Sequence, residues 1–180
     1  MIGVLVSGEG TNLQALLEAG LPVVAVASSR REARALDRAR AAGLPAEVFA
    51  LDAYPDREAR DAAMAGWLEE RGAELVVCAG YMHLLRPTFL DRFPGRVVNV
   101  HPAPLPEFPG AHPLEDVLAA GASHAAATVH FVDEGVDTGE VIASEPVVVE
   151  PGDTVETLRE RVHAVEHRLL PEVVKQLCAR

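Results

Sequence analysis

An asparagine and a histidine lie two residues apart near the end of an apolar stretch, Val97–His101. Residues two apart on a β-strand project from the same face, so Asn99 and His101 are expected to face one way. Pro102 follows directly and keeps the backbone of His101 extended. The prolines up to Gly110 predict a stiff, irregular loop. A buried strand that ends in an amide and an imidazole makes Asn99 and His101 candidate catalytic residues.

The alternative is that both side chains only cap backbone groups at the end of the strand. Composition favours a functional role for Asn99, because the chain contains only two asparagines in 180 residues, Asn12 and Asn99. Both lie in segments that carry other functional signals. In a chain this poor in amides, the remaining amides are expected to be needed where they stand.

A glycine-containing loop, Ser7–Asn12, separates a predicted buried strand, Ile2–Val6, from a predicted helix, Leu13–Ala19. This order of strand, loop and helix directs free backbone N–H groups toward a phosphate. A dinucleotide site is not expected, because the third glycine of that motif is missing and no ribose-binding acid follows the second strand. We interpret the loop as a monophosphate cradle. The alternative is an ordinary turn that needs glycine for tightness.

Two more loops follow predicted strands. Gly80–Leu85 comes after the buried strand Leu75–Ala79, and its histidine, His83, is either a ligand contact or a solvated residue. The acidic loop Asp133–Gly139 contains Asp137 and lacks the spacing of an EF-hand calcium site. It follows a predicted strand and is expected to reach the same crevice as the other loops.

Strands and helices alternate through the first 101 residues, which is typical of a parallel sheet with helices on both faces. The sequence therefore predicts an α/β fold, in which residues 1–180 form a single domain around a Rossmann-like, mostly parallel twisted sheet. The later strands arrive by shorter connections and are expected to be antiparallel. Such sheets bind ligands at the carboxyl ends of their strands, where the loops above, Asn99 and His101 all fall.

The remaining pattern predicts strands at Val23–Ala27, Ala46–Ala50, Ala126–Val132 and Val141–Val149, and helices at Glu32–Ala42, Asp56–Arg71, Pro87–Phe93 and Pro113–Ala120. A last helix is expected to open with a capping box at Asp153–Glu156. Pro171 is expected to kink or split this helix.

Charge and composition exclude several classes of protein. A net charge of −11 argues against nucleic-acid partners, because an acidic chain repels phosphate backbones. No run of residues approaches the roughly 18 apolar residues of a membrane span, and Met1–Val6 lacks the basic start of a signal peptide. Two cysteines, Cys78 and Cys178, suggest neither a disulfide framework nor a metal site. A reducing cytoplasm fits best.

Taken in order, the motifs resemble the phosphoribosylglycinamide formyltransferases of purine synthesis, and the likeness covers nearly all 180 residues. The segments that carry the resemblance are Val4–Leu16, Ala79–Leu85, Asn99–Pro102 with Leu105–Pro106 and Pro109–Gly110, Thr128–Val132, and Asp137–Gly139. The resemblance implies the formyltransferase fold. It also implies transfer of a formyl group from 10-formyltetrahydrofolate to the amine of glycinamide ribonucleotide.

By this similarity, Gly10, Thr11 and Asn12 would hold the ribonucleotide phosphate, and Met82, His83, Leu84 and Leu85 would line the folate pocket. Asn99, His101 and Asp137 would carry the chemistry. The amide and the protonated imidazole suit an oxyanion, and the carboxylate can keep His101 cationic and help remove the amine proton through water. No metal is required. The chain is expected to act as a monomer or a homodimer.

This chain departs from the family at several positions. The family usually has Arg where this chain has His83, and Ala103 and Glu107 replace a common Ser and Lys. The chain also ends at Arg180, before a segment that in relatives contributes a basic contact to the phosphate. The phosphate site is therefore expected to be less complete than in relatives.

A tRNA formyltransferase is not expected, because it needs a further C-terminal domain and positive charge. Two alternatives stay open. A formyltetrahydrofolate hydrolase keeps the same Asn, His and Asp but usually carries an extra N-terminal domain. A noncatalytic nucleotide-binding module would leave Asn99, His101 and Asp137 without a shared purpose.

Overall fold

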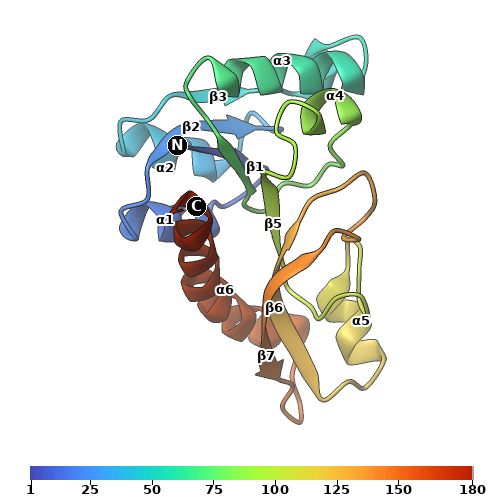
Figure 1. The fold of residues 1–180 in the computed structure, drawn as a ribbon. Coiled ribbons are helices and arrows are strands. Elements are labelled where there is room, and N and C mark those ends of the chain that lie inside the picture. The colour runs from blue at the N-terminus through green and yellow to red at the C-terminus, as the bar shows by residue number, and fades with distance from the viewer. Residues whose placement is uncertain (180) are drawn as a thin grey trace. The chain divides into compact units, whose positions relative to one another are not determined.

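The computed structural model describes residues 1–179, and the strands in this range follow the order β3-β2-β1-β4-β5-β6-β7 in one sheet (Figure 1). The strands are β1 (Ile2–Val6), β2 (Val23–Ser28), β3 (Ala46–Val48), β4 (Leu75–Cys78), β5 (Val97–His101), β6 (His124–Phe131) and β7 (Val141–Val148). The helices are α1 (Thr11–Glu18), α2 (Arg34–Ala41), α3 (Arg57–Glu69), α4 (Pro87–Leu90), α5 (Pro113–Ala119) and α6 (Val155–Cys178), with a 3₁₀ turn, η1, at Leu51–Ala53.

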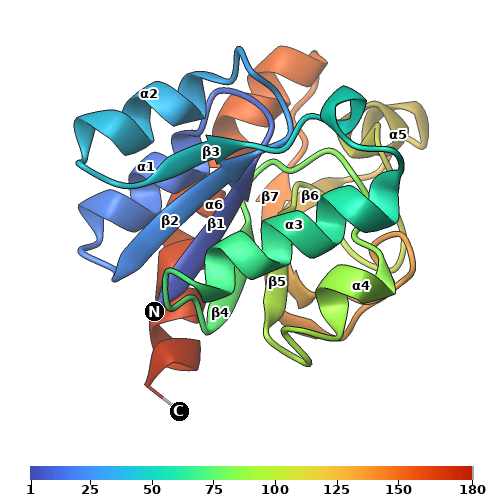
Figure 2. The same ribbon diagram turned by 90° about the horizontal axis from the view of Figure 1, so that it is seen from above.

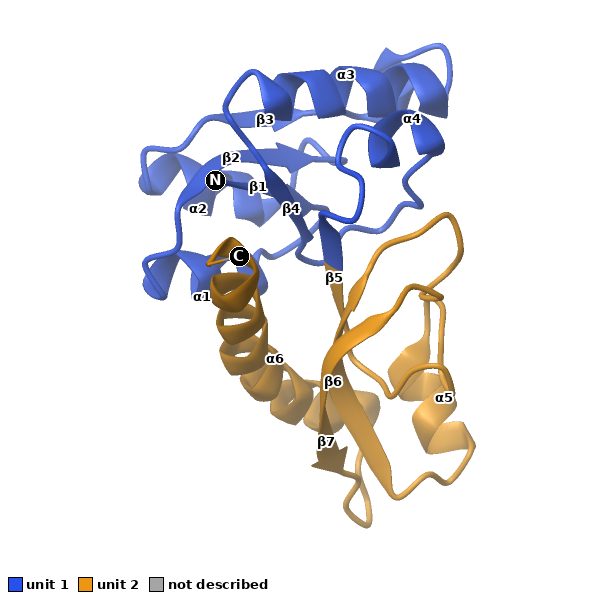
Figure 3. Cartoon of the chain, viewed as in Figure 1, with its two compact units in different colours: residues 1–98 blue, residues 99–180 orange. Residues whose placement is uncertain are grey.

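Strand β1 pairs in parallel with β2 and β4, and β2 pairs in parallel with β3, whereas β6 and β7 are antiparallel. The predicted α/β class with a mostly parallel sheet is therefore confirmed, and so is the antiparallel arrangement of the late strands. The chain divides into two compact units, Met1–Val98 (unit 1) and Asn99–Arg180 (unit 2), which Figure 3 colours separately.

Unit 1 is built on strands that are apolar on both faces. Every residue of β1 and β4 is buried, as expected for strands covered on two sides. Helices α1 and α2 lie on one face of these strands and α3 lies on the other (Figure 2). The parallel register pairs Val6 with Ser28 and Leu5 with Cys78, so the carboxyl ends of β1, β2 and β4 are level. The loops that follow these strands therefore start side by side.

Unit 2 is built on the antiparallel pair β6 and β7, along which α6 packs (Figure 3). Strand β6 is buried from Ala125 to His130, whereas β7 is largely exposed. The buried face of α6 carries Leu158, Val162, Leu169, Leu170, Val173 and Val174. This apolar face gives the long helix its tertiary support.

The structure corrects two details of the last helix, namely the residues of its capping box and the expected split at Pro171. Thr154, not Asp153, is the N-cap, and its capping box is completed by Thr157 rather than Glu156. A threonine hydroxyl serves as well as a carboxylate in both positions, so the spacing alone did not identify the cap. Helix α6 also runs through Pro171 without a break. Pro171 is itself buried within the apolar face, and packing of that face offsets the missing backbone hydrogen bond.

The other predicted elements are all present, with ends that differ by a few residues. Among residues 1–179, no helix is both long enough and apolar enough to cross a membrane.

Candidate active site

Asn99, His101 and Asp137 come together in unit 2. Strand β5 carries Asn99 and His101, and the loop between β6 and β7 carries Asp137. The Nδ1 atom of His101 lies 3.4 Å from Oδ2 of Asp137, and the two side chains are only 5% and 14% exposed. An imidazole and a carboxylate that face each other and are this little exposed interact strongly, because solvent screens them weakly.

Two further groups contact the Asp137 carboxylate. The N–H of Gly110 donates a hydrogen bond of 2.9 Å to Oδ2, and Nε2 of His130 lies 3.5 Å from Oδ1. Burial alone would raise the pKa of Asp137. The contacts with His130 and Gly110 and the nearby His101 outweigh burial and hold the pKa below its ordinary value. Asp137 is therefore a carboxylate at neutral pH.

The backbone around Asp137 is tightly constrained. Asp137 itself has a φ of +53°, in the left-handed region that Asp and Asn reach more readily than other side-chain-bearing residues. Two residues later, a Cβ on Gly139 would lie 1.8 Å from the carbonyl oxygen of Phe131, so only glycine fits. This narrow turn directs the carboxylate of Asp137 toward the two histidines.

The second ring nitrogen of His101 is also engaged. Its Nε2 lies 2.7 Å from the carbonyl oxygen of Phe108, in the proline-rich loop that follows β5. A carbonyl can only accept, so Nε2 carries a proton. His101 therefore contacts Asp137 only through Nδ1, and because a carboxylate can only accept, a hydrogen bond between them requires a proton on Nδ1.

The prediction from sequence missed His130 as a site residue. Its side chain on β6 is 3% exposed. Its Nδ1 lies 2.8 Å from the carbonyl oxygen of Phe131, and its Nε2 lies 3.2 Å from the Asn99 amide nitrogen. Nδ1 must be the donor to a carbonyl, so Nε2 is the ring atom that contacts both the Asn99 amide nitrogen and the Asp137 carboxylate. This contact orients the amide of Asn99. The available signal was the alternation that places Thr128 and His130 on one face of β6.

The glycine loop lies in unit 1, where Gly10 directly precedes α1 in a left-handed conformation, with φ of +75°. A Cβ at this position would lie 2.6 Å from the Cβ of Ala35 on α2. Glycine is therefore required at position 10 by both backbone conformation and space. The guanidinium of Arg38 donates a 2.8 Å hydrogen bond to the carbonyl oxygen of Glu9 and so fixes the loop. Thr11 and Asn12 form the first turn of α1.

The loop of residues 80–85 follows β4 and is tied to the end of β1. The N–H of Met82 donates a 3.0 Å hydrogen bond to Oγ of Ser7, whose hydroxyl lies 2.7 Å from that of Ser29. All three residues are within unit 1, so the structure connects the loop that contains Met82 with the start of the glycine loop. Neither serine was singled out from the sequence.

Two apolar side chains of this loop face solvent, because Met82 is 68% exposed and Leu84 is 42% exposed, whereas Leu85 is buried. Burial lowers the pKa of His83, and the nearby cation of Arg60 lowers it further. His83 is therefore neutral at pH 7. The loop presents two accessible apolar side chains and a neutral imidazole, which suit an aromatic ligand better than an anionic one.

Within residues 1–179, no group of three or more His, Cys, Asp and Glu side chains is arranged to hold a metal ion. The chemistry available in unit 2 is an amide donor, two imidazoles and one carboxylate. Such groups stabilise a developing oxyanion and transfer protons.

Comparison with known proteins identifies relatives along the whole chain. The family model described as formyl transferase matches residues 1–174. A phosphoribosylglycinamide formyltransferase of Mycobacterium tuberculosis is 45% identical over 179 residues, which cover 97% of this chain and 83% of that protein. The solved phosphoribosylglycinamide formyltransferase of Streptococcus pneumoniae has a TM-score of 0.94 at 44% identity, covering 98% of this chain and 97% of that one.

Longer proteins also match. The trifunctional purine biosynthetic protein adenosine-3 of Drosophila pseudoobscura is 39% identical over 186 residues, but the chain spans only 14% of its length. The family is shown by the family model and by the relatives of similar length, without this longer protein. From its sequence and its fold, this chain belongs to the formyl transferase family.

Proposed function

We propose that this chain transfers a formyl group from 10-formyltetrahydrofolate to the amine of glycinamide ribonucleotide, in the de novo synthesis of purines. The observation that carries the proposal is the contact of Asp137 with two histidines, one of which contacts the Asn99 amide, in a chain whose relatives of similar length are named phosphoribosylglycinamide formyltransferase. An amide, imidazoles and a carboxylate are the groups that acyl transfer to an amine requires.

In the proposed reaction, the amine nitrogen attacks the formyl carbon and the carbonyl electron pair moves onto oxygen. Asn99 and cationic His101 donate hydrogen bonds to this oxyanion. Asp137 stabilises the cation and, through water, accepts the proton that the amine loses. Return of the electron pair from oxygen then breaks the bond to the folate nitrogen, which takes up a proton.

The two contacts of His101 differ in length, and the difference indicates how each responds to substrate. The contact between Nε2 and the Phe108 carbonyl is 2.7 Å, whereas the contact between Nδ1 and Asp137 is 3.4 Å. The longer contact, to Asp137, is expected to tighten when substrate binds, because catalytic hydrogen bonds are often long in the empty enzyme. The proton that His101 donates to the oxyanion is then the one on Nε2, which turns from the Phe108 carbonyl to the substrate.

The binding residues in this proposal lie in unit 1. Gly10, Thr11 and Asn12 hold the ribonucleotide phosphate at the start of α1, where backbone N–H groups favour an anion. Met82, His83, Leu84 and Leu85 contact the folate. We further propose a cytoplasmic enzyme that acts as a monomer or homodimer, with no nucleic-acid or membrane partner.

The test is an assay of 10-formyltetrahydrofolate consumption with and without glycinamide ribonucleotide. We expect consumption to require the amine and to yield one formylated ribonucleotide for each tetrahydrofolate. Equal consumption without the amine would identify a hydrolase instead, and no consumption in either case would indicate a noncatalytic binding module.

A further inference from the structure

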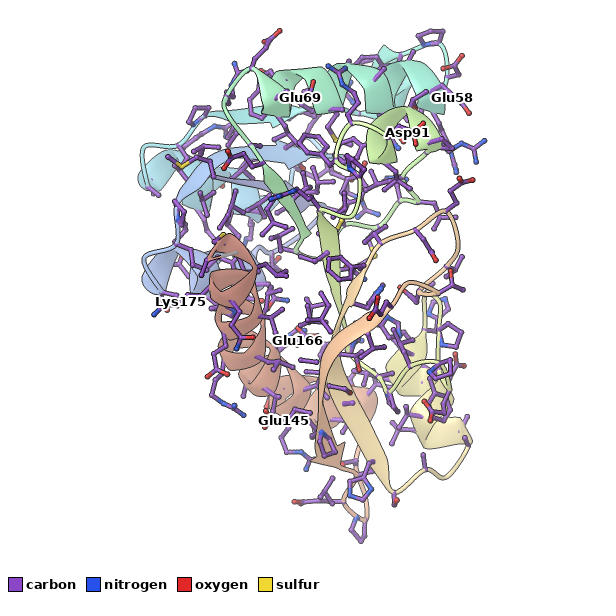
Figure 4. All side chains as sticks on the ribbon, in the orientation of Figure 1. Glu58, Glu69, Asp91, Glu145, Glu166 and Lys175 are labelled. Atoms are coloured by element: carbon purple, nitrogen blue, oxygen red, sulfur yellow. The ribbon has the colours of Figure 1, made fainter. Side chains whose placement is uncertain are left out.

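Helix α3 contains a charged pair that is completely buried. Arg60 and Asp61 have no exposed side-chain surface, and Nε and Nη2 of Arg60 both donate to Oδ1 of Asp61, at 2.9 and 2.7 Å. The proposed chemistry uses neither residue. Figure 4 labels Glu58 and Glu69, which lie near the two ends of the same helix.

The other oxygen of Asp61 holds the backbone at the end of the 80–85 loop. Oδ2 accepts a 2.8 Å hydrogen bond from the N–H of Arg86, the residue that follows the loop and caps α4. The start of the loop is held by Ser7, which accepts from the N–H of Met82. The backbone of this loop is therefore fixed at two points by side chains from outside it, and Asp61 supplies the more deeply buried of them.

Stability alone does not explain this pair. Removing two charges from water costs several kcal/mol per ion, and an apolar pair of similar volume is often as stable or more stable. The cost is higher here because Nη1 of Arg60 is buried without a hydrogen-bond partner. What the ionised pair provides is a carboxylate with one oxygen locked by the guanidinium and the other directed at a single backbone N–H.

We propose that Asp61, locked by Arg60, is a positioning residue that keeps the 80–85 loop in the conformation that receives the formyl donor. This inference rests on the proposed function, in which Met82 to Leu85 contact the folate. Through Arg86, Asp61 sets the backbone at the end of the loop, and misplacement of binding groups by even 1 Å is costly.

Two double variants separate the hydrogen bond from the charges. R60M/D61N removes both charges but keeps an amide oxygen that can accept from the N–H of Arg86. R60M/D61L also removes both charges and leaves that N–H without an acceptor. Neither variant leaves one buried charge unpaired, so both are expected to fold. E58Q is the matched surface control, because the half-exposed carboxylate of Glu58 hydrogen-bonds the side chain of Arg86 and not its backbone N–H, at 3.0 Å.

We expect R60M/D61L to raise the KM for 10-formyltetrahydrofolate about tenfold over R60M/D61N, because the part-buried N–H of Arg86 has lost its acceptor. The KM for glycinamide ribonucleotide should change less than about twofold. Tetrahydrofolate binding, measured by fluorescence titration, should weaken in parallel. Amide hydrogen exchange at residues 80–86 should accelerate in R60M/D61L only. E58Q should match the wild type in all four measurements.

Equal donor KM and tetrahydrofolate affinity in the two double variants would overturn the positioning role, and so would a parallel rise in the KM for both substrates. Wild-type turnover is measured first, because its absence contradicts the proposed function. Tetrahydrofolate binding and amide exchange do not depend on turnover, so they test the positioning role separately.

Discussion

Asp137 determines the electrostatics of the candidate active site, since its carboxylate contacts two imidazoles and one backbone N–H. Each contact favours the ionised form, and the charge is held in place before any substrate arrives. Preorganised charge of this kind contributes most where charge develops during a reaction. Asp137 should therefore matter more for turnover than for substrate binding.

Replacement of Asp137 by Asn is expected to lower kcat by about 10²-fold or more and to change KM much less, since the lost interaction is with charge in the transition state. The D137N/H101A double variant should be little slower than the slower single variant, because both residues serve one step. Steady-state kinetics of the four proteins measure this directly. Strictly multiplicative losses would show that His101 and Asp137 act independently.

The lowered pKa of Asp137 also predicts how stability changes with pH. An unfolded Asp carboxyl titrates near about 3.9, and the folded one titrates lower. As pH falls through this window, the unfolded chain takes up the proton first. The stabilisation is complete above about pH 4 and is lost as pH falls through the folded pKa.

Urea unfolding between pH 2 and 6 should therefore show a shallower loss of unfolding free energy for D137N than for the wild type at the acidic end. D91N is the control for loss of one exposed carboxylate; Asp91, labelled in Figure 4, follows α4. The same loss of unfolding free energy at acidic pH in D137N and in the wild type would contradict a lowered pKa of Asp137.

At the scale of elements, the carboxyl ends of the strands in unit 1 set where the binding loops start. The loop after β1 and the loop after β4 begin at neighbouring positions because the strands are in register. Ser7 directly follows β1 and Ser29 directly follows β2, and the contact between their hydroxyls connects the ends of these two strands. The glycine loop is held in addition by Arg38 from α2.

Two glycines of this loop should respond differently to substitution. G10A forces a Cβ to within 2.6 Å of Ala35 and strains a left-handed backbone, so it should move the start of α1. We expect at least about a tenfold rise in the KM for glycinamide ribonucleotide. G8A should stay within about twofold of wild type, since nothing lies within 4 Å of a Cβ there. Equal KM values for the two variants would exclude the loop from the phosphate site.

The order and type of the elements could be predicted because apolar runs mark the strands and helices of this chain, and glycines and prolines mark their ends. Asn99 and His101 could be predicted as candidate catalytic residues because residues two apart on a strand face the same way. The contacts of the Phe108 carbonyl and the Gly110 N–H could not be predicted, because backbone groups are the same in every residue type. His130 was missed because its role depends on the side chains of other elements. The buried pair on α3 gave no signal, since charged residues on a helix usually face water.

At the scale of the whole molecule, the two compact units share one strand. The boundary falls within β5, with Val97 and Val98 in unit 1 and Asn99 to His101 in unit 2. Melting of either unit would remove part of this strand from the other. The single domain expected for residues 1–180 therefore remains our prediction for its folding.

Calorimetric unfolding should give one transition whose van 't Hoff and calorimetric enthalpies agree. Circular dichroism and the fluorescence of Trp67, which lies in unit 1, should report the same midpoint. Two separate transitions, or a fluorescence midpoint that differs from the circular dichroism midpoint, would contradict a single domain.

The left-handed backbone of Asp137 also bears on how descendants of this gene can change. Asn and Gly accept that conformation without strain, whereas other side chains incur about 1–2 kcal/mol there. The substitutions at position 137 that best preserve the fold, to Asn or Gly, are therefore ones that remove the negative charge of Asp137. In the proposed reaction, one such substitution would remove the chemistry of Asp137 and leave a folded protein. A change to Glu would keep an acid but would place its longer side chain on a strained backbone.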